Sequence, residues 1–191
     1  MKIAIVKLSS LGDIIHSMVA LQFIKKYHPD YEIDWIVEER FKGLLINNPH
    51  LNAVHTVCLK EIKSWRLFLN EIRKIRNFGS YDVVIDAQGL IKSSIVSRLI
   101  KSKKRVGFDR RSIREPLATC LYTDKVYVDY SKNTIDRMVE LICLPFGVKV
   151  SKDEIINKSL FIYTSSRLKV PKKPYIVFVI GSTWENRNYP K

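Results

Sequence analysis

The sequence has no long apolar run, few cysteines, few glycines and few acidic residues. No run approaches the roughly 20 apolar residues that a helix needs to cross a bilayer. The N-terminus shows no basic segment followed by an apolar stretch and a small-residue cleavage site, so we expect neither a membrane-spanning helix nor a secretory signal. Instead, 46% hydrophobic and 27% charged residues in a chain of 191 are typical of a soluble globular protein.

Cysteine and histidine are too sparse to suggest a disulfide framework or a metal centre. The three cysteines, Cys58, Cys120 and Cys143, lie far apart and form no CxxC pair. Such a set indicates free thiols in a reducing compartment. The four histidines form neither HxxxH nor HExxH, so the sequence predicts no metal site.

Acidic residues are outnumbered by basic ones. The 33 Lys and Arg against 19 Asp and Glu give a formal net charge of +14, and a field of this sign attracts phosphates. The partner could be nucleic acid, an anionic membrane surface or a small substrate with several phosphates. The sequence has none of the motifs that would indicate a nucleic-acid-binding module: no RNP-type aromatic motif, no zinc-finger spacing and no helix-turn-helix on its own. A basic α/β module that binds nucleic acid or an anionic surface without catalysis stays an alternative.

Strand and helix patterns alternate along the chain. Apolar runs predict strands over residues 2–7, 31–39, 53–59, 81–87 and 104–108. Helical spacing of apolar residues predicts helices over 12–27, 65–76, 89–100 and 133–144, with shorter ones over 40–47 and 115–121. This order predicts the α/β class, with a Rossmann-like, mainly parallel sheet and helices on both faces. Ligands of such sheets bind at the carboxyl ends of the strands.

The end of the chain differs in composition. SSRLKVPKKP (165–174) has two prolines and four basic residues and indicates a linker. YIVFVI, which follows it, predicts another buried strand. We therefore expect one domain over residues 1–164, the linker over 165–174, and over 175–191 the first strand and loop of a second domain.

The first strand-to-helix turn, KLSSLGDIIHS (7–17), carries a carboxylate. With one glycine, Gly12, it is neither a GxGxxG nucleotide-binding turn nor a P-loop. Ser10 and Asp13 fit the [ST]xx[DE] capping box at a helix N-terminus. Alternatively, Asp13 is a general base that faces the ligand crevice and takes a proton from a hydroxyl. The two roles are compatible.

Three further polar segments are candidates for ligand binding. After the strand at 81–87, a polar cluster of Asp86, Gln88 and Gly89 would lie at the crevice edge and could hold a sugar or phosphate, unless Asp86 or Gln88 caps the next helix. Lys and Arg side chains in LKEIKSWRLF (59–68) and KSKKRVGFDRRSIREP (101–116) could clamp phosphates or simply be solvated. They include Lys60, Lys63, Arg66 and Arg114. In GSTWENR (181–187), the small hydroxyl residues suit a diphosphate, unless this is an ordinary loop.

Four segments together resemble the lipopolysaccharide heptosyltransferases: VKLSSLGDIIHS (6–17), DWIVEERF (34–41), YDVVIDAQGLIKS (81–93) and REPLA (114–118). The resemblance implies a GT-B fold, in which two Rossmann-like domains face each other across a cleft. It implies inverting, metal-free transfer of heptose from ADP-L-glycero-β-D-manno-heptose, a co-substrate rather than a cofactor, to a Kdo hydroxyl of Kdo-lipid A. A related enzyme that adds the second heptose stays an alternative, although DAQGL (86–90) favours the first. It also implies a cytoplasmic enzyme, peripheral on the bacterial inner membrane, with no nucleic acid as partner.

The resemblance also implies roles for particular residues. Asp13 corresponds to the catalytic base, and Ser10 lines the same pocket. Basic residues that face the acceptor's phosphates and carboxylates are Lys60, Lys63, Arg66 and Arg114. The donor diphosphate is contacted by Ser182 and Thr183, with Arg187 balancing charge on the leaving ADP. Because the family has a whole second domain after GSTWENR, we expect residues 1–191 to bind acceptor but to be inactive in transfer.

Overall fold

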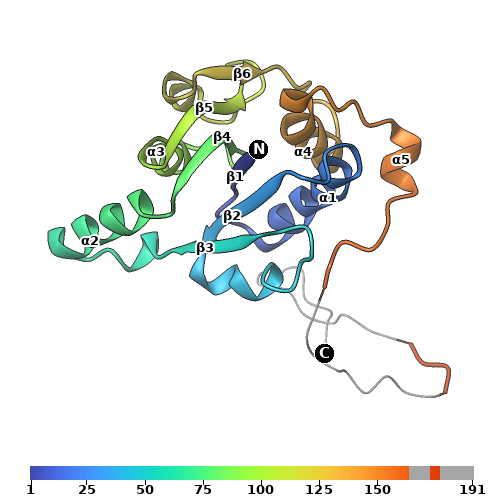
Figure 1. Cartoon of the computed structure of the whole chain (residues 1–191), viewed down its shortest axis with the longest axis horizontal. Helices are drawn as coiled ribbons and strands as arrows, with labels where there is room; N and C mark the ends of the chain where they lie inside the picture. The colour runs from blue at the N-terminus through green and yellow to red at the C-terminus, as the bar shows by residue number, and fades with distance from the viewer. Residues whose placement is uncertain (164–172, 177–191) are drawn as a thin grey trace, which may run out of the picture.

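The computed structural model describes residues 1–163 and 173–176, and it contains one six-stranded parallel sheet (Figure 1). Every neighbouring pair of strands is parallel, in the order β3-β2-β1-β4-β5-β6. The strands are β1 (Lys2–Val6), β2 (Glu32–Glu38), β3 (Ala53–Val57), β4 (Ser80–Asp86), β5 (Lys101–Phe108) and β6 (Asp124–Val126). The predicted α/β class and parallel sheet are confirmed.

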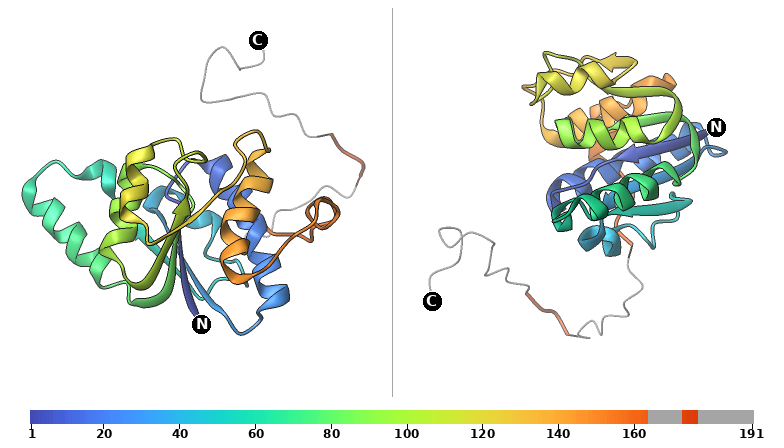
Figure 2. Two further views of the ribbon diagram at one scale, coloured as in Figure 1. Left: turned by 90° about the horizontal axis from the view of Figure 1, so that it is seen from above. Right: turned by 90° about the vertical axis from the view of Figure 1, so that its left-hand side faces the viewer.

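Helices cover both faces of this sheet, as Figure 2 shows. The α-helices are α1 (Leu11–Tyr27), α2 (Trp65–Arg76), α3 (Ile91–Leu99), α4 (Thr134–Cys143) and α5 (Lys152–Ile156). Short 3-10 helices are η1 (Glu39–Leu44), η2 (Leu59–Glu61), η3 (Pro116–Leu121) and η4 (Leu144–Phe146). α1 and α4 pack together on one face, and α2 and α3 lie on the other.

Two apolar cores follow from alternation along the central strand. Ile3 and Ile5 of β1 belong to the core under α1 and α4, whereas Ala4 and Val6 belong to the core under α2 and α3. Successive strand residues point to opposite faces, so a strand covered on both sides is apolar at every position. This explains why the sequence pattern of β1 is a continuous apolar run.

The strand order places the turns after β1 and β4 side by side. From β1 the chain builds outward through β2 to β3, then crosses back to add β4 on the other side of β1. Val6 and Asp86, the last residues of these two strands, are paired in register. This is the topological switch point, where open parallel sheets bind their ligands.

The predicted linker and final strand lie largely outside the described residues. Of the predicted strand, the structure describes only Tyr175 and Ile176, which are exposed and belong to no strand. The domain boundaries therefore stay predictions. Within the described part of the chain, no helix has the length and apolar character needed to cross a bilayer.

Candidate active site

Hydrogen bonds lock the turns after β1 and β4 to each other. Gln88 Oε1 accepts from the backbone N–H groups of Leu8 (3.0 Å) and Ser9 (3.1 Å). In return, Lys7 Nζ donates to the carbonyl oxygen of Ala87 at 2.9 Å. The turn after β4 therefore fixes the backbone that leads into α1.

Asp86 anchors the second turn from inside the protein. Its carboxylate is fully buried and accepts from Gln88 N (2.9 Å), Gly89 N (3.2 Å), Ser93 Oγ (2.9 Å) and Tyr122 Oη (2.7 Å). Burial raises the pKa of Asp86 above its ordinary value, although these hydrogen bonds oppose the shift. Asp86 is therefore neither a crevice group nor the cap of α3, whose N-cap is Leu90. It holds the turn before that helix from inside the protein.

Asp13 closes the first turn of α1 and stays half-buried. Its Oδ2 accepts from Ser10 N at 3.1 Å and from Ser10 Oγ at 2.7 Å, which confirms the predicted capping role. Burial raises the pKa of Asp13, but the two Ser10 hydrogen bonds and the charges of Lys7 and His16 outweigh it, so that the pKa lies below its ordinary value. The carboxylate is therefore ionised at neutral pH.

A cavity of about 190 Å³ opens beside these turns. Its ionised side chains are one carboxylate, Asp13, and three cations, Lys7, Arg114 and Arg137. Lys7 is only 5% exposed, and burial lowers its pKa, while the nearby Asp13 and Asp86 oppose that shift. The excess of positive charge suits an anionic ligand that presents a hydroxyl to Asp13.

Arg137 reaches the cavity from α4, at the far end of the sequence from Asp13. Its Nη2 donates to the carbonyl oxygen of Ser112 at 2.6 Å, and its guanidinium carbon lies 4.2 Å from the Tyr130 ring centroid and 5.2 Å from that of Phe108. Its buried Nε has no hydrogen-bond partner among the described residues. The side chain is thus held in place, and its buried Nε–H is available to a ligand.

Only part of this group is predictable from the sequence. The structure brings Asp13, Gln88 and Arg114 together at the cavity, with Ser10 bonded to Asp13. Lys7 and Arg137 were missed. The one available signal for Lys7 was a lysine directly after a buried strand. Arg137 is the single basic residue of the amphipathic α4, next to Asp136, and gave no signal of its own.

The remaining predicted residues lie elsewhere or are not described. Three predicted cations lie around η2 and the start of α2, where they are exposed and do not line the cavity: Lys60, Lys63 and Arg66. The predicted donor residues lie outside the described residues: Ser182, Thr183 and Arg187. Within residues 1–163 and 173–176, no three His, Cys, Asp or Glu side chains are grouped to hold a metal ion.

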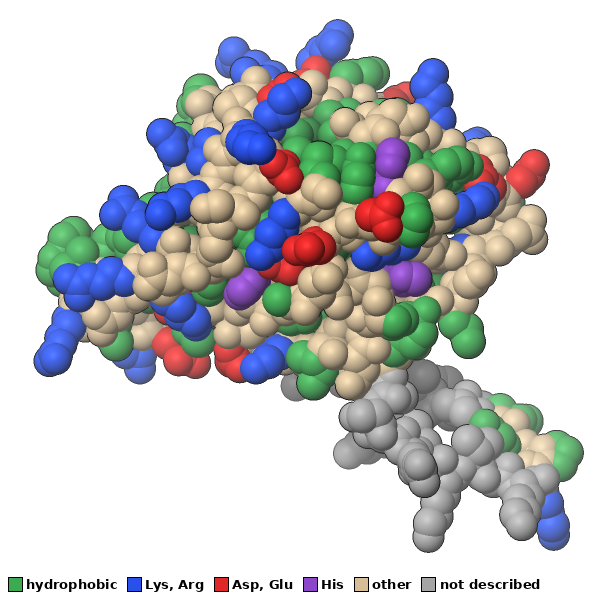
Figure 3. Space-filling model, in the orientation of Figure 1, with side chains coloured by type: hydrophobic (Ala, Val, Ile, Leu, Met, Phe, Trp, Pro, Cys, Tyr) green, Lys and Arg blue, Asp and Glu red, His purple; other side chains and the backbone are tan. Residues whose placement is uncertain are grey.

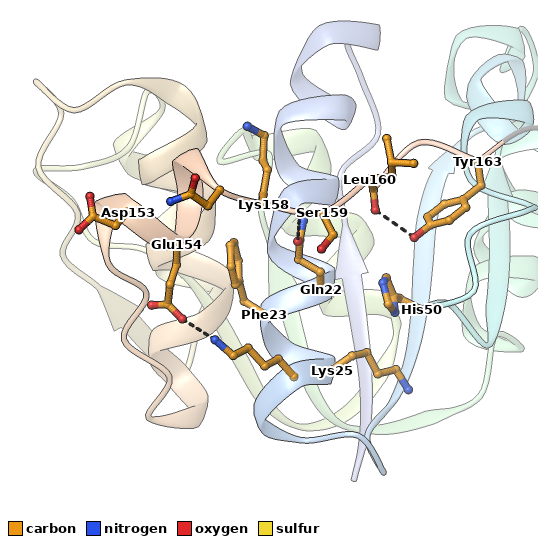
Figure 4. A pocket seen from close by; sticks show the side chains of 12 residues that line it. Gln22, Phe23, Lys25, His50, Asp153, Glu154, Lys158, Ser159, Leu160 and Tyr163 are labelled. Atoms are coloured by element: carbon orange, nitrogen blue, oxygen red, sulfur yellow. Dashed lines mark hydrogen bonds and ion pairs between the residues drawn. The ribbon is translucent and has the colours of Figure 1, made fainter.

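A larger hollow, of about 750 Å³, lies beside the C-terminal half of α1 (Figure 4). Its polar groups are largely engaged: Gln22 Oε1 accepts from Ser159 N at 2.9 Å, and Lys26 Nζ lies 2.7 Å from Glu154 Oε1. Lys26 is about 20 Å from Asp13 along the helix axis, at 1.5 Å per residue. None of the predicted site residues lines this hollow, so we assign it no chemistry.

Ser10→Ala is expected to raise the pKa of Asp13, because the substitution removes the Oγ hydrogen bond that favours the ionised form. A depressed carboxyl pKa contributes stability above the unfolded-state pKa, and this contribution is lost as the pH falls through the folded-state pKa. In the variant, that loss therefore begins at a higher pH. A ¹³C NMR titration of the Asp13 carboxyl measures the shift directly. Ser9→Ala is the matched control, and an unchanged Asp13 pKa in Ser10→Ala would contradict the assignment.

The fold and the cavity define a class: a Rossmann-like α/β domain with an ionised carboxylate among cations at the switch point. The sequence profile of glycosyltransferase family 9 (heptosyltransferase) matches residues 70–191, more than half of the chain. The chain therefore belongs to this family.

Individual relatives agree with this assignment. The chain is 39% identical to lipopolysaccharide heptosyltransferase 1 of Campylobacter coli and 31% identical to that of Pseudomonas aeruginosa, with the whole chain covered in both cases. It spans only 58% and 55% of those two proteins. The solved structure of Escherichia coli heptosyltransferase WaaC with ADP-2-deoxy-2-fluoro heptose superposes with a TM-score of 0.83 at 28% identity, over 100% of this chain and 62% of WaaC.

Proposed function

We propose that this chain is the acceptor-binding part of an enzyme that transfers L-glycero-D-manno-heptose from ADP-heptose to a Kdo hydroxyl of Kdo-lipid A. The observation that carries the proposal is the Asp13 carboxylate, held by Ser10 in a cationic cavity of a family 9 chain. The relatives named lipopolysaccharide heptosyltransferase 1, and the WaaC structure with an ADP-heptose analogue, support this choice of substrates.

In this reaction Asp13 is the general base. Its carboxylate takes the proton of the acceptor hydroxyl while the hydroxyl oxygen attacks C1 of the heptose. The bond between C1 and the diphosphate oxygen breaks, and ADP leaves with the electron pair, so the anomeric configuration inverts. The Ser10 hydrogen bonds to Oδ2 orient the carboxylate and keep it ionised.

The cations of the cavity suit the acid groups of the acceptor. A Kdo unit carries a carboxylate, and Lys7, Arg114 and Arg137 are placed to hold it while its hydroxyl faces Asp13. Gln88 fixes the turn and lines the same cavity. The phosphates of lipid A extend farther from the reacting hydroxyl, and we assign their recognition to the outlying basic residues: Lys60, Lys63 and Arg66.

The donor contacts belong to the part of the chain after the acceptor domain. Ser182 and Thr183 hold the ADP diphosphate, and Arg187 stabilises the leaving group, within a segment over 175–191 that begins the donor domain. The linker is 165–174 and the acceptor domain 1–164. The enzyme works without a metal or cofactor, in the cytoplasm, peripherally on the inner membrane.

The test has two arms. Calorimetric titration of the 191-residue chain with a deacylated Kdo-lipid A headgroup is expected to show saturable binding that weakens when Lys7 and Arg137 are replaced by Gln. A form carrying both domains is expected to transfer heptose from ADP-heptose to Kdo-lipid A in the presence of EDTA. Strong salt-sensitive binding of a short DNA duplex with no headgroup binding would instead favour the non-catalytic module.

A further inference from the structure

The N-terminal end of α2 exposes two aromatic rings. Trp65 is 71% exposed and Phe68 is 38% exposed, although their ring centroids lie 5.2 Å apart. At the other end of the helix Ile75 is buried in the core with α3. Exposed aromatic clusters of this kind mark surfaces that are covered by something else.

Basic side chains surround these rings. Lys60, Lys63 and Arg66 are all exposed, and residues 60–76 contain six Lys or Arg against two Glu. Figure 3 shows hydrophobic side chains beside Lys and Arg at the end of the molecule where Figure 1 labels α2. We call these three cations, with Trp65 and Phe68, the α2 tip.

The topology places the α2 tip on the same edge of the sheet as the Asp13 cavity. β3 ends at Val57, at the carboxyl edge, and η2 leads directly to Ser64, whose Oγ caps α2 by accepting from Leu67 N at 3.3 Å. The first turn of α2 therefore lies at the carboxyl edge, where the β1 turn also lies. A surface touching the α2 tip is on the side from which a lipid-linked acceptor would enter.

We propose that the α2 tip docks on an anionic lipid bilayer, with Trp65 and Phe68 entering the interfacial layer. Lys60, Lys63 and Arg66 then face the phosphates of the bilayer lipids, and those of lipid A are among them when the acceptor is present. Tryptophan is suited to this layer because its ring is apolar and its N–H is polar. A second copy of the chain fits less well, since it would bring the same positive charge to the contact. The proposal adds a docking surface to the proposed function and depends on it only for the lipid-linked acceptor.

Flotation with vesicles of phosphatidylglycerol and phosphatidylethanolamine, free of any lipid A, tests the docking. The 191-residue chain is expected to float with these vesicles and to remain behind with phosphatidylcholine vesicles. Trp65→Ala/Phe68→Ala is expected to weaken partitioning about tenfold through lost apolar burial. Neutralising Lys60, Lys63 and Arg66 to Gln is expected to weaken it about 100-fold at low salt, from about 1 kcal/mol per cation.

Matched control variants replace exposed residues around α5. Ile156→Ala/Leu160→Ala removes two exposed apolar side chains, 72% and 84% exposed, and should change partitioning less than twofold. The same is expected when the exposed Lys149 and Lys152 and the half-buried Lys158 become Gln. Equal losses in the controls and the α2-tip variants would overturn the proposal, as would an unchanged Trp65→Ala/Phe68→Ala variant.

Tryptophan fluorescence gives a second measurement that does not depend on the stability of the double variant. The measurement uses a Trp184→Phe background, in which Trp65 and the fully buried Trp35 are the remaining tryptophans. Lipids brominated near the headgroup should quench this bound protein, and the more conservative Trp65→Phe should remove that quenching while leaving flotation nearly unchanged. Quenching that persists in Trp65→Phe would contradict insertion at this site. Because the vesicles contain neither acceptor nor donor, a failure of docking and a failure of heptose transfer are separate results.

Discussion

Asp13→Asn is expected to lower kcat for heptose transfer by about 10²–10⁴-fold, the usual contribution of a positioned general base. The amide cannot take the proton of the acceptor hydroxyl, although it has the size of the carboxylate and can still accept from Ser10 N. Because the cations of the cavity are unchanged, KM for the acceptor should change only a few-fold. The measurement is initial-rate kinetics with a form of the protein that carries both domains.

Two comparisons make this prediction specific. Asp30→Asn alters an exposed carboxylate just beyond α1 and should leave the rate unchanged. Because the pKa of Asp13 is low, its carboxylate stays ionised in mildly acidic solution. As the pH is lowered, kcat/KM of the parent should therefore fall only at pH values below the ordinary pKa range of an Asp carboxyl. Transfer by Asp13→Asn near the parental rate would remove Asp13 from the chemistry.

Most of the fold was predictable because most elements are long and periodic. The pattern predicted α2 over 65–76, which matches its bounds of Trp65–Arg76, and it predicted the strongly apolar β4 to within a residue or so. β6 and α5 were missed, since three and five residues are too few to show a period. β5 begins at Lys101, earlier than predicted, because its exposed lysines pair with β4 through the backbone and carry no apolar signal.

The candidate site was predictable where the groups are local and not where they are distant. Ser10 and Asp13 are three residues apart, so their capping pattern can be read directly from the sequence. Arg137 lies on a different element and meets Asp13 only through the packing of α4 against α1. Likewise, Gly107 is needed because a Cβ there would lie 2.2 Å from the Tyr122 ring, a contact that no local pattern reveals.

The second large effect is expected in stability, from the carboxylate that holds the turn after β4. Asp86→Ala leaves two backbone N–H groups and the Tyr122 hydroxyl without their acceptor at a fully buried position, while Ser93 Oγ keeps the Leu90 carbonyl. We expect it to lower the free energy of unfolding by about 3–5 kcal/mol, since each unsatisfied buried donor costs about 1–3 kcal/mol and the turn can relax only in part. Urea unfolding of the 191-residue chain measures this change.

Tyr122→Phe and Asp82→Ala separate this explanation from a general effect of losing an aspartate. Tyr122→Phe removes one of the four donors and should cost about 1 kcal/mol. Asp82, on the same strand, is partly exposed, pairs with Lys103 and accepts from Lys2 N, so its removal should cost clearly less than that of the buried Asp86. If Asp86→Ala unfolds too readily for a urea titration, hydrogen exchange in the Tyr122→Phe chain still reports on the turn. The Tyr122→Phe substitution should lower the protection of the Gln88 and Gly89 amides from exchange. It should also lower the protection of the Leu8 and Ser9 amides, which donate to Gln88. An Asp86→Ala chain within about 1 kcal/mol of the parent would mean that the turn carrying Gln88 is held by packing alone.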